Sequence, residues 1–175
     1  MKGLAALLAA AVLLSACAVP SVLQSDGGPV TNGRLSLRVE PVGERPAQGL
    51  NAAFELQGNA ERGELRLMSP LGGQLTAARW APGQAVLDTP AGRQEFASLD
   101  ELSRRALGEV LPLAALPDWL AGRPWPGATN VAVAAGFEQL GWRVDVARRL
   151  EGWVVATRDA PPAVSLRVRL EAPAP

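Results

Sequence analysis

Cys17 is the only cysteine among the 175 residues, so it carries the one thiol available for covalent chemistry. The chain also has no histidine and no tyrosine. Without histidine it cannot build a Ser-His-Asp triad, a Cys-His pair or the metal sites that use imidazole ligands. Asp100 and Glu101 are neighbouring carboxylates, but they point apart at a helix start, and no spacing supports hydrolysis by a carboxylate pair. The residue types therefore predict no metal, no cofactor and no enzyme.

The residues before Cys17 have the order of an export signal. Lys2 gives a positive start, and residues 4–14 are a run of Ala, Leu and Val, shorter than the roughly 20 residues that span a bilayer. Leu14-Ser15-Ala16-Cys17 resembles the lipobox of bacterial lipoproteins, in which the thiol receives a diacylglycerol and the new amine is acylated after cleavage. We expect residues 1–16 to be this signal. The alternative is an ordinary signal peptide with an incidental cysteine.

A lipid on Cys17 predicts where the protein resides. The exported chain cannot form an internal disulfide, although its compartment would permit one. Covalent lipid contributes about 0.8 kcal/mol per buried CH₂, and two or more chains give stable anchoring. Ala18 follows the cysteine. Enteric-type sorting retains lipoproteins with Asp at that position in the inner membrane, so Ala18 is compatible with an anchor on the periplasmic face of the outer membrane.

The rest of the chain is expected to be one domain on a tether. Residues 17–32 hold the lipidated cysteine and a flexible tether that contains Ser, Gly and Pro, and residues 33–172 have the length of a single domain with a sizeable core. Removal of Lys2 with the signal leaves 16 basic and 17 acidic residues, a formal charge of −1. No basic stripe stands out, so we expect no nucleic-acid partner, and we expect a monomer.

Apolar and polar residues alternate over several stretches, as in strands with one buried face. The apolar positions are Leu35, Leu37 and Val39; Leu50, Ala52, Phe54 and Leu56; Leu65 and Leu67; and Leu166, Val168 and Leu170. Glycines separate the stretches, and turns are predicted at Gly33, Gly43, Gly58, Gly63, Gly83 and Gly92. The pattern indicates an antiparallel sheet with one apolar and one solvated face.

Two helices are predicted in the middle of the chain. Ser98 and Glu101 fit a capping box, with Ser98 as N-cap and Glu101 reaching back to the Ser98 amide. Apolar residues then recur at helical spacing until Gly108, a natural stop. A second short helix is predicted over residues 112–120, although Pro117 would remove a hydrogen bond from its interior. Strands, two helices and further strands make an α+β fold in which the helices cover the sheet's apolar face.

Four segments, in order along the chain, resemble the LolB family of outer-membrane lipoprotein receptors. They are Gly63-Glu64-Leu65-Arg66-Leu67 with Ser69-Pro70-Leu71-Gly72; Leu107-Gly108, Leu111-Pro112-Leu113, Leu116, Trp119-Leu120 and Gly122-Arg123-Pro124; Phe137-Glu138-Gln139-Leu140-Gly141-Trp142-Arg143-Val144; and Pro161-Pro162 before the last strand. The resemblance implies an incompletely closed antiparallel β-barrel, or half-barrel, with helices covering an apolar cavity. It also implies a receptor that accepts lipoproteins from a LolA-type periplasmic carrier by their acyl chains and releases them into the outer membrane without ATP.

Pro70, Leu71 and Gly72 are the candidate membrane-insertion loop. Pro70 and Gly72 are turn formers, which places Leu71 at the tip of a loop. The resemblance implies that this protruding leucine engages the membrane and helps to release the cargo. Burial of one leucine gains only about 1.5–3 kcal/mol, enough to bias a transient insertion but not to anchor a protein. The alternative is that Leu71 folds back onto the sheet edge.

The inward-facing residues become candidates for the acyl-chain cavity, although they could equally pack an ordinary core. They are Leu35, Leu37, Phe54, Leu56, Leu65, Leu67, Trp142, Val144, Leu166 and Val168. A filled core without a lipid-binding cavity would favour a different function, that of a structural lipoprotein in envelope assembly.

Overall fold

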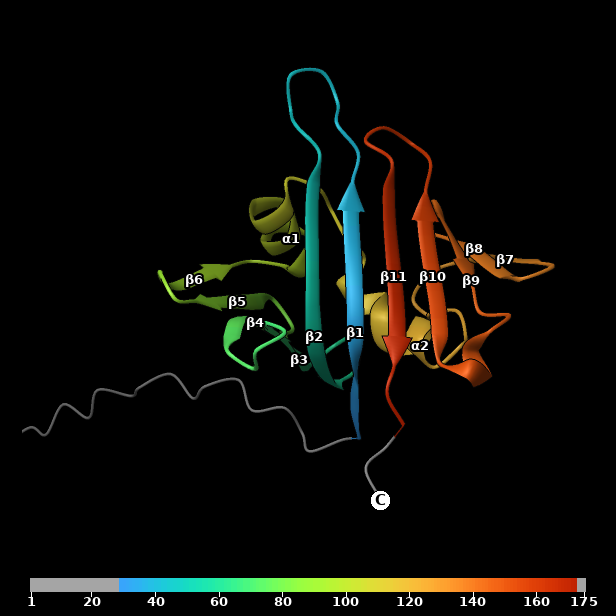
Figure 1. Ribbon diagram of the computed structural model, residues 1–175, viewed down its shortest axis with the longest axis horizontal. Coiled ribbons are helices and arrows are strands. Elements are labelled where there is room, and N and C mark those ends of the chain that lie inside the picture. Colours follow the sequence, from blue (N-terminus) through green and yellow to red (C-terminus); the bar gives the residue numbers. More distant parts are fainter. Residues whose placement is uncertain (1–28, 173–175) are drawn as a thin grey trace, which may run out of the picture.

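The alternating stretches form the strands of one large antiparallel sheet in the computed structural model, which describes residues 29–172 (Figure 1). Cys17 and its signal lie outside the described residues. The strands are β1 (Val30–Val39), β2 (Gln48–Gly58), β3 (Gly63–Met68), β4 (Gln74–Ala81), β5 (Gln84–Thr89), β6 (Gly92–Phe96), β7 (Asn130–Val133), β8 (Gly136–Gln139), β9 (Trp142–Asp145), β10 (Trp153–Arg158) and β11 (Val164–Leu170). The helices are α1 (Leu99–Leu107) and α2 (Leu116–Leu120), with short 3₁₀ turns η1 (Leu113–Ala115) and η2 (Arg149–Glu151).

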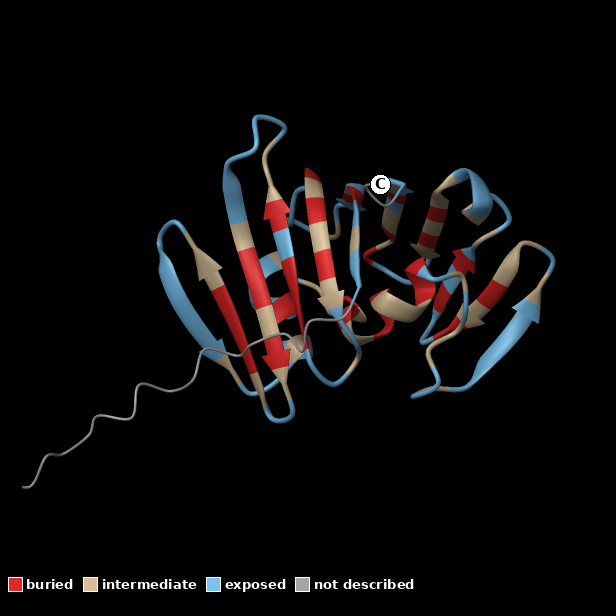
Figure 2. Cartoon of the chain, turned by 90° about the horizontal axis from the view of Figure 1, so that it is seen from below, coloured by how far each residue is buried: buried red, intermediate tan, exposed pale blue. Residues whose placement is uncertain are grey.

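The first and last strands pair at the centre of the sheet. The strand order is β6-β5-β4-β3-β2-β1-β11-β10-β9-β8-β7, so β6 and β7 form the two edges, and they are not paired with each other within residues 29–172. The sheet curves around α1 and α2, which connect these edges and lie on its inner side (Figures 1 and 2). The predicted α+β fold, an incompletely closed antiparallel barrel with helices against one face, is confirmed.

The two faces of the sheet separate as the alternation predicts. Leu37, Val39 and Phe54 are buried on the inner side, whereas Arg34 and Arg38 are exposed on the outer side. Figure 2 shows this as bands of buried and less buried residues along the strands. β1 begins at Val30 and therefore includes three residues that the sequence placed in the tether. No helix within residues 29–172 is both long enough and apolar enough to cross a bilayer.

Two of the glycines predicted as turns have another role. Gly33 lies inside β1, where a Cβ atom would come within 2.4 Å of the Arg169 main-chain oxygen and 2.8 Å of the Phe54 ring. Gly63 begins β3 and would place a Cβ atom 2.5 Å from the Trp80 ring. The turn predictions at these two positions were wrong, because both glycines are required by close packing between neighbouring strands.

The first helix begins and ends where the sequence predicts. Ser98 Oγ accepts a hydrogen bond from the Glu101 amide at 3.1 Å, and Gly108 ends α1 with a φ of 72°. The capping box differs in one detail, because Glu101 Oε2 accepts from the Ala97 amide at 3.0 Å rather than from Ser98. The second predicted helix is divided into η1 and α2. Pro117 lies in the first turn of α2, where a missing N–H costs no helical hydrogen bond.

An ionic ladder crosses the outer face of β3 to β6. Glu64 Oε1 lies 2.9 Å from Arg66 Nε and 2.9 Å from Arg79 Nη2. Arg79 also contacts Asp88, whose other oxygen lies 2.8 Å from Arg93 Nε. These contacts explain how Glu64 can be buried on the polar face of the sheet.

Replacement of Asp88 by Asn should lower the free energy of unfolding by about 1 kcal/mol at neutral pH, because Arg79 and Arg93 lose their shared carboxylate. The Arg93 and Arg79 guanidinium groups hold the pKa of Asp88 below its ordinary value of 3.8. The carboxylate therefore stabilises the fold above pH 3.8, and this contribution is lost as the pH falls through the lower folded-state pKa. Urea unfolding of both proteins at several pH values checks this. A difference that stayed constant to the most acid pH would contradict it.

Candidate functional site

An apolar cavity of about 340 Å³ lies between α1 and the sheet. Its volume falls within the roughly 300–1,000 Å³ typical of small-molecule sites. One wall consists of strand residues and the other of helical and connecting residues. The lining is Leu35, Leu37, Leu50, Leu65, Leu67, Thr76, Ala78, Leu87, Thr89, Leu102, Ser103, Ala106, Leu107, Leu111, Leu113, Leu116 and Leu166.

The polar side chains in this lining already have partners within the protein. Thr76 Oγ1 donates to the Asp88 main-chain oxygen at 2.9 Å, and Thr89 Oγ1 donates to that of Gly92 at 3.1 Å. Ser103 Oγ donates to the Asp100 oxygen at 3.2 Å and accepts from the Leu111 amide at 3.1 Å. None of the lining residues is charged. The wall therefore suits a hydrocarbon chain better than a polar ligand.

Half of the ten residues named from the sequence meet at this cavity. They are Leu35, Leu37, Leu65, Leu67 and Leu166. The other five are buried in the core outside it: Phe54, Leu56, Trp142, Val144 and Val168. The difference arises because α1 and η1 leave space above one half of the sheet, whereas α2 fills the other half. There the Trp119 ring centroid lies 6.4 Å from that of Phe137 and 6.1 Å from that of Trp142.

The sequence analysis did not name the helical side of the cavity. Leu102, Ala106 and Leu107 of α1 line it, together with the leucines at 111, 113 and 116. Their helical spacing was visible, but it indicated only that the helix covers the sheet. The position of Ala106, which is exposed and yet lines the cavity, identifies it as part of the mouth.

Ala106→Trp should narrow this mouth and weaken the binding of a fluorescent apolar probe at least about tenfold, a loss of about 1.4 kcal/mol. The melting temperature should change little, because the new side chain starts from an exposed helical position. Arg105→Trp, an exposed neighbour on α1 that does not line the cavity, is the matched control. Equal probe affinities for the two variants would show that the probe binds elsewhere.

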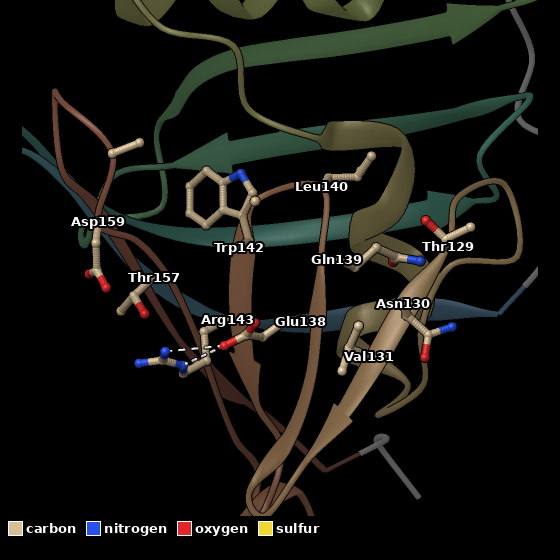
Figure 3. A pocket seen from close by; sticks show the side chains of 12 residues that line it. Thr129, Asn130, Val131, Glu138, Gln139, Leu140, Trp142, Arg143, Thr157 and Asp159 are labelled. Carbon is tan, nitrogen blue, oxygen red and sulfur yellow. Dashed lines mark hydrogen bonds and ion pairs between the residues drawn. The ribbon is translucent and has the colours of Figure 1, made fainter.

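A second hollow, of about 440 Å³, lies at the β7–β9 edge and has a mixed lining (Figure 3). Glu138 and Arg143 form an ion pair there at 3.1 Å, and Asn130, Thr157 and Asp159 also line it. Such charged groups would lose their hydration beside a hydrocarbon chain. Trp142 lies at this hollow and not at the leucine-lined cavity.

Gln139, which is 2% exposed, joins three segments beneath this edge of the sheet. Its Oε1 accepts from the Trp119 indole N–H at 2.8 Å and from the Trp125 amide at 2.9 Å. Its Nε2 donates to the main-chain oxygens of Trp125 at 2.7 Å and of Ala128 at 2.8 Å. The one side chain thus holds α2 and the following loop against β8.

The β3–β4 loop presents Leu71 at its tip. Gly72 N–H donates to the Ser69 oxygen at 2.9 Å, and the Ser69 amide donates to the Gly73 oxygen at 2.8 Å. Gly72 adopts a φ of 86°, which favours glycine. Leu71 is 97% exposed, so it is not folded back onto the sheet edge. The loop is a closed turn that holds an apolar side chain in solvent.

Comparisons with known proteins agree with this architecture. Residues 30–171 match the family model described as outer membrane lipoprotein LolB. The chain is 33% identical over 181 residues to a protein of Cupriavidus pinatubonensis named outer-membrane lipoprotein LolB, with 94% of this chain and 84% of that protein covered. Proteins of the same name from Cupriavidus metallidurans and Chromobacterium violaceum are 32% and 30% identical, covering 79% of this chain in each case and 69% and 78% of the relatives.

The family match spans both the half-barrel and the loop that carries Leu71. The three relatives share one name, which places them in the outer membrane as lipoproteins. The chain therefore belongs to the LolB family, and it is a lipoprotein of the outer membrane rather than an enzyme.

Proposed function

We propose that this protein accepts lipoproteins from a LolA-type periplasmic carrier and releases them into the outer membrane. The observation that supports this most directly is the leucine-lined cavity, whose polar groups are satisfied internally and whose wall carries no charge. A structural envelope lipoprotein would have no use for such a space. In this proposal the client's acyl chains occupy the cavity after their uptake from the carrier and before their release into the outer membrane.

The cavity also explains why direct transfer is required. An acyl chain loses about 0.8 kcal/mol for each CH₂ moved from an apolar site into water, so release into the periplasm would be very unfavourable. Transfer without ATP must therefore proceed from weaker to stronger binding, and each tenfold step needs only about 1.4 kcal/mol. A cavity that covers a chain only partly binds it less well than a bilayer, which makes the last step favourable.

The anchor and the loop have separate roles in this proposal. Acylated Cys17 holds the protein at the membrane, and residues 18–29 connect it to β1 after removal of the 1–16 signal. Leu71 contributes too little apolar area to anchor the protein, but its exposure allows it to enter the bilayer when cargo is delivered. The protein acts as a monomer, because the cavity is complete within one chain.

The first experiment mixes the unlipidated mature chain, carrying Cys17→Ser, with a carrier loaded with a labelled lipoprotein. We expect the label to move to this protein in solution, without membranes. A carrier from the same organism that kept all of its label would favour the structural envelope lipoprotein instead. In cells, loss of this protein should lead to accumulation of carrier-bound lipoproteins, and normal sorting would count against the receptor role.

A further inference from the structure

The outer face of the sheet carries a groove that the binding of acyl chains does not use. Its volume is about 660 Å³. Arg34 of β1 and Arg167 and Arg169 of β11 line it, with Pro70 and Gly72 of the β3–β4 loop on one side and Trp153 on the other. The groove therefore extends from the Leu71 loop across the centre of the sheet.

The three arginines of the groove have little carboxylate compensation. Arg34 and Arg169 are direct cross-strand partners, an arrangement of like charges that destabilises a sheet. The carboxylate nearest to Arg34 belongs to Glu171, at 3.9 Å, and both side chains are largely exposed. Arg169 donates to the Glu151 main-chain oxygen and lies 5.2 Å from the Trp153 ring centroid.

Arg167, unlike Arg34, Arg38 and Arg66 on the same face, has no ion pair in the described part of the chain. Within residues 29–172 no carboxylate lies within ion-pair distance of it. By comparison, Arg38 on β1 lies 2.6 Å from Glu40, and Arg66 on β3 lies 2.9 Å from Glu64. Adjacent like charges repel one another, and an external anion bound between them would relieve this repulsion.

A second fully exposed leucine lies across the groove from Leu71. Leu150 is 102% exposed at the middle of η2, the turn between β9 and β10. The turn is fixed, because Arg148 pairs with Glu151 at 2.7 Å and Gly152 N–H donates to the Arg149 oxygen at 2.9 Å. The Arg149 side chain also donates to the Leu120 oxygen at the end of α2. Several contacts thus stabilise a turn that holds an apolar side chain in water.

The two leucine-bearing turns flank the arginine groove. Arg169 lines the groove and also a shallow hollow around Leu150 and Val30, the first residue of β1. η2 leads into β10 at the end of the sheet at which β1 begins, whereas the β3–β4 loop follows Met68 at the opposite end of β3, so the two turns border the groove diagonally. Val30, from which the chain leads back to Cys17, lines the same hollow as Leu150. Two apolar tips and a cationic groove therefore share the outer side of the sheet, and the start of β1 lies beside one of the tips.

We propose that this side is a membrane-docking surface for anionic phospholipid, with Leu150 as a second inserting residue and Arg34, Arg167 and Arg169 as phosphate ligands. This rests on the proposed function, in which the protein delivers cargo to a bilayer. Burial of one leucine changes membrane partitioning about tenfold to a hundredfold. An arginine near an anionic surface adds about fivefold, and guanidinium groups match phosphate oxygens in geometry. Trp153 suits the boundary between headgroups and acyl chains.

The test is co-sedimentation of the unlipidated full mature chain (Cys17→Ser) with vesicles of phosphatidylcholine, alone or mixed with phosphatidylglycerol. Leu150→Glu should weaken binding about tenfold or more to both kinds of vesicle. The double variant Arg34→Gln/Arg167→Gln should lose at least about fivefold, but only with phosphatidylglycerol present. The matched controls, which should bind normally, are Val131→Glu on edge strand β7 and Arg104→Gln/Arg105→Gln on α1, all exposed and away from the groove.

Several outcomes would overturn the docking surface. One is unchanged vesicle binding by Leu150→Glu, and another is an equal loss for the arginine variant on both kinds of vesicle. Competition by inorganic phosphate at constant ionic strength would instead indicate a site for a free anion. Normal vesicle binding with impaired uptake from the carrier would assign the surface to the carrier. Label transfer in solution tests the receptor role without membranes, so either proposal can fail while the other stands.

Discussion

Leu71→Glu is expected to leave uptake of labelled lipoprotein from the carrier intact and to reduce its delivery to liposomes at least about tenfold. Leu71 is 97% exposed on a closed turn, so the fold does not depend on its side chain. Its burial in a bilayer favours insertion, whereas a carboxylate would have to lose its hydration to enter the same place. Delivery is measured as label that floats with liposomes after incubation with the loaded receptor.

Two further variants make this result specific. Leu71→Met keeps an apolar tip of similar size and should deliver nearly as well as the parent protein. Val131→Glu adds the same charge at another exposed apolar residue, on edge strand β7, and should also deliver normally. If Leu71→Glu blocked uptake from the carrier as well, the loop would be part of the carrier interface and the insertion role would be wrong.

Gln139→Leu is expected to lower the free energy of unfolding by about 3–5 kcal/mol, a large part of the roughly 5–15 kcal/mol that stabilises a typical domain. Leucine fills nearly the same space but makes no hydrogen bonds. The change would leave the Trp119 indole, both main-chain groups of Trp125 and the Ala128 oxygen without their partner. Urea denaturation followed by tryptophan fluorescence would measure the loss.

Gln94→Leu, the same substitution at an exposed position of β6, should change the free energy of unfolding by less than about 0.5 kcal/mol. Apolar-probe affinity of Gln139→Leu should remain normal under conditions in which it is folded, because Gln139 does not line the leucine cavity. A loss of less than 1 kcal/mol would mean that water replaces the amide at these four groups.

The sequence allowed the strands to be predicted well, because a buried face imposes alternation with a period of two. It could not reveal the pairing of β1 with β11, since that contact joins residues more than 120 positions apart in the chain. The misassigned turn at Gly33 has the same origin. A glycine that accommodates a neighbouring strand has the same local signal as a glycine in a turn, and only the cross-strand register distinguishes them.

The site was predicted in part for a related reason. Alternation assigns a residue to the inner face, but it does not show whether that residue lines the cavity or packs in the core outside it. Leu37 and Phe54 therefore had the same sequence pattern, although only Leu37 lines the cavity. Leu71 was visible because Pro70 and Gly72 flank it. Leu150 has no turn former before it and lies among charged residues, so the sequence pattern does not indicate that it occupies an exposed turn.

The open sheet also has a cost for the protein at high concentration. A closed barrel has no unpaired edges, but this one has β6 and β7, each with main-chain donors and acceptors available to another chain. β7 has only four residues, and β6 carries Arg93 and Glu95, features that discourage edge-to-edge association. The incomplete closure of the barrel thus makes these two strands the natural starting points for aggregation, and their short length and charge counteract it.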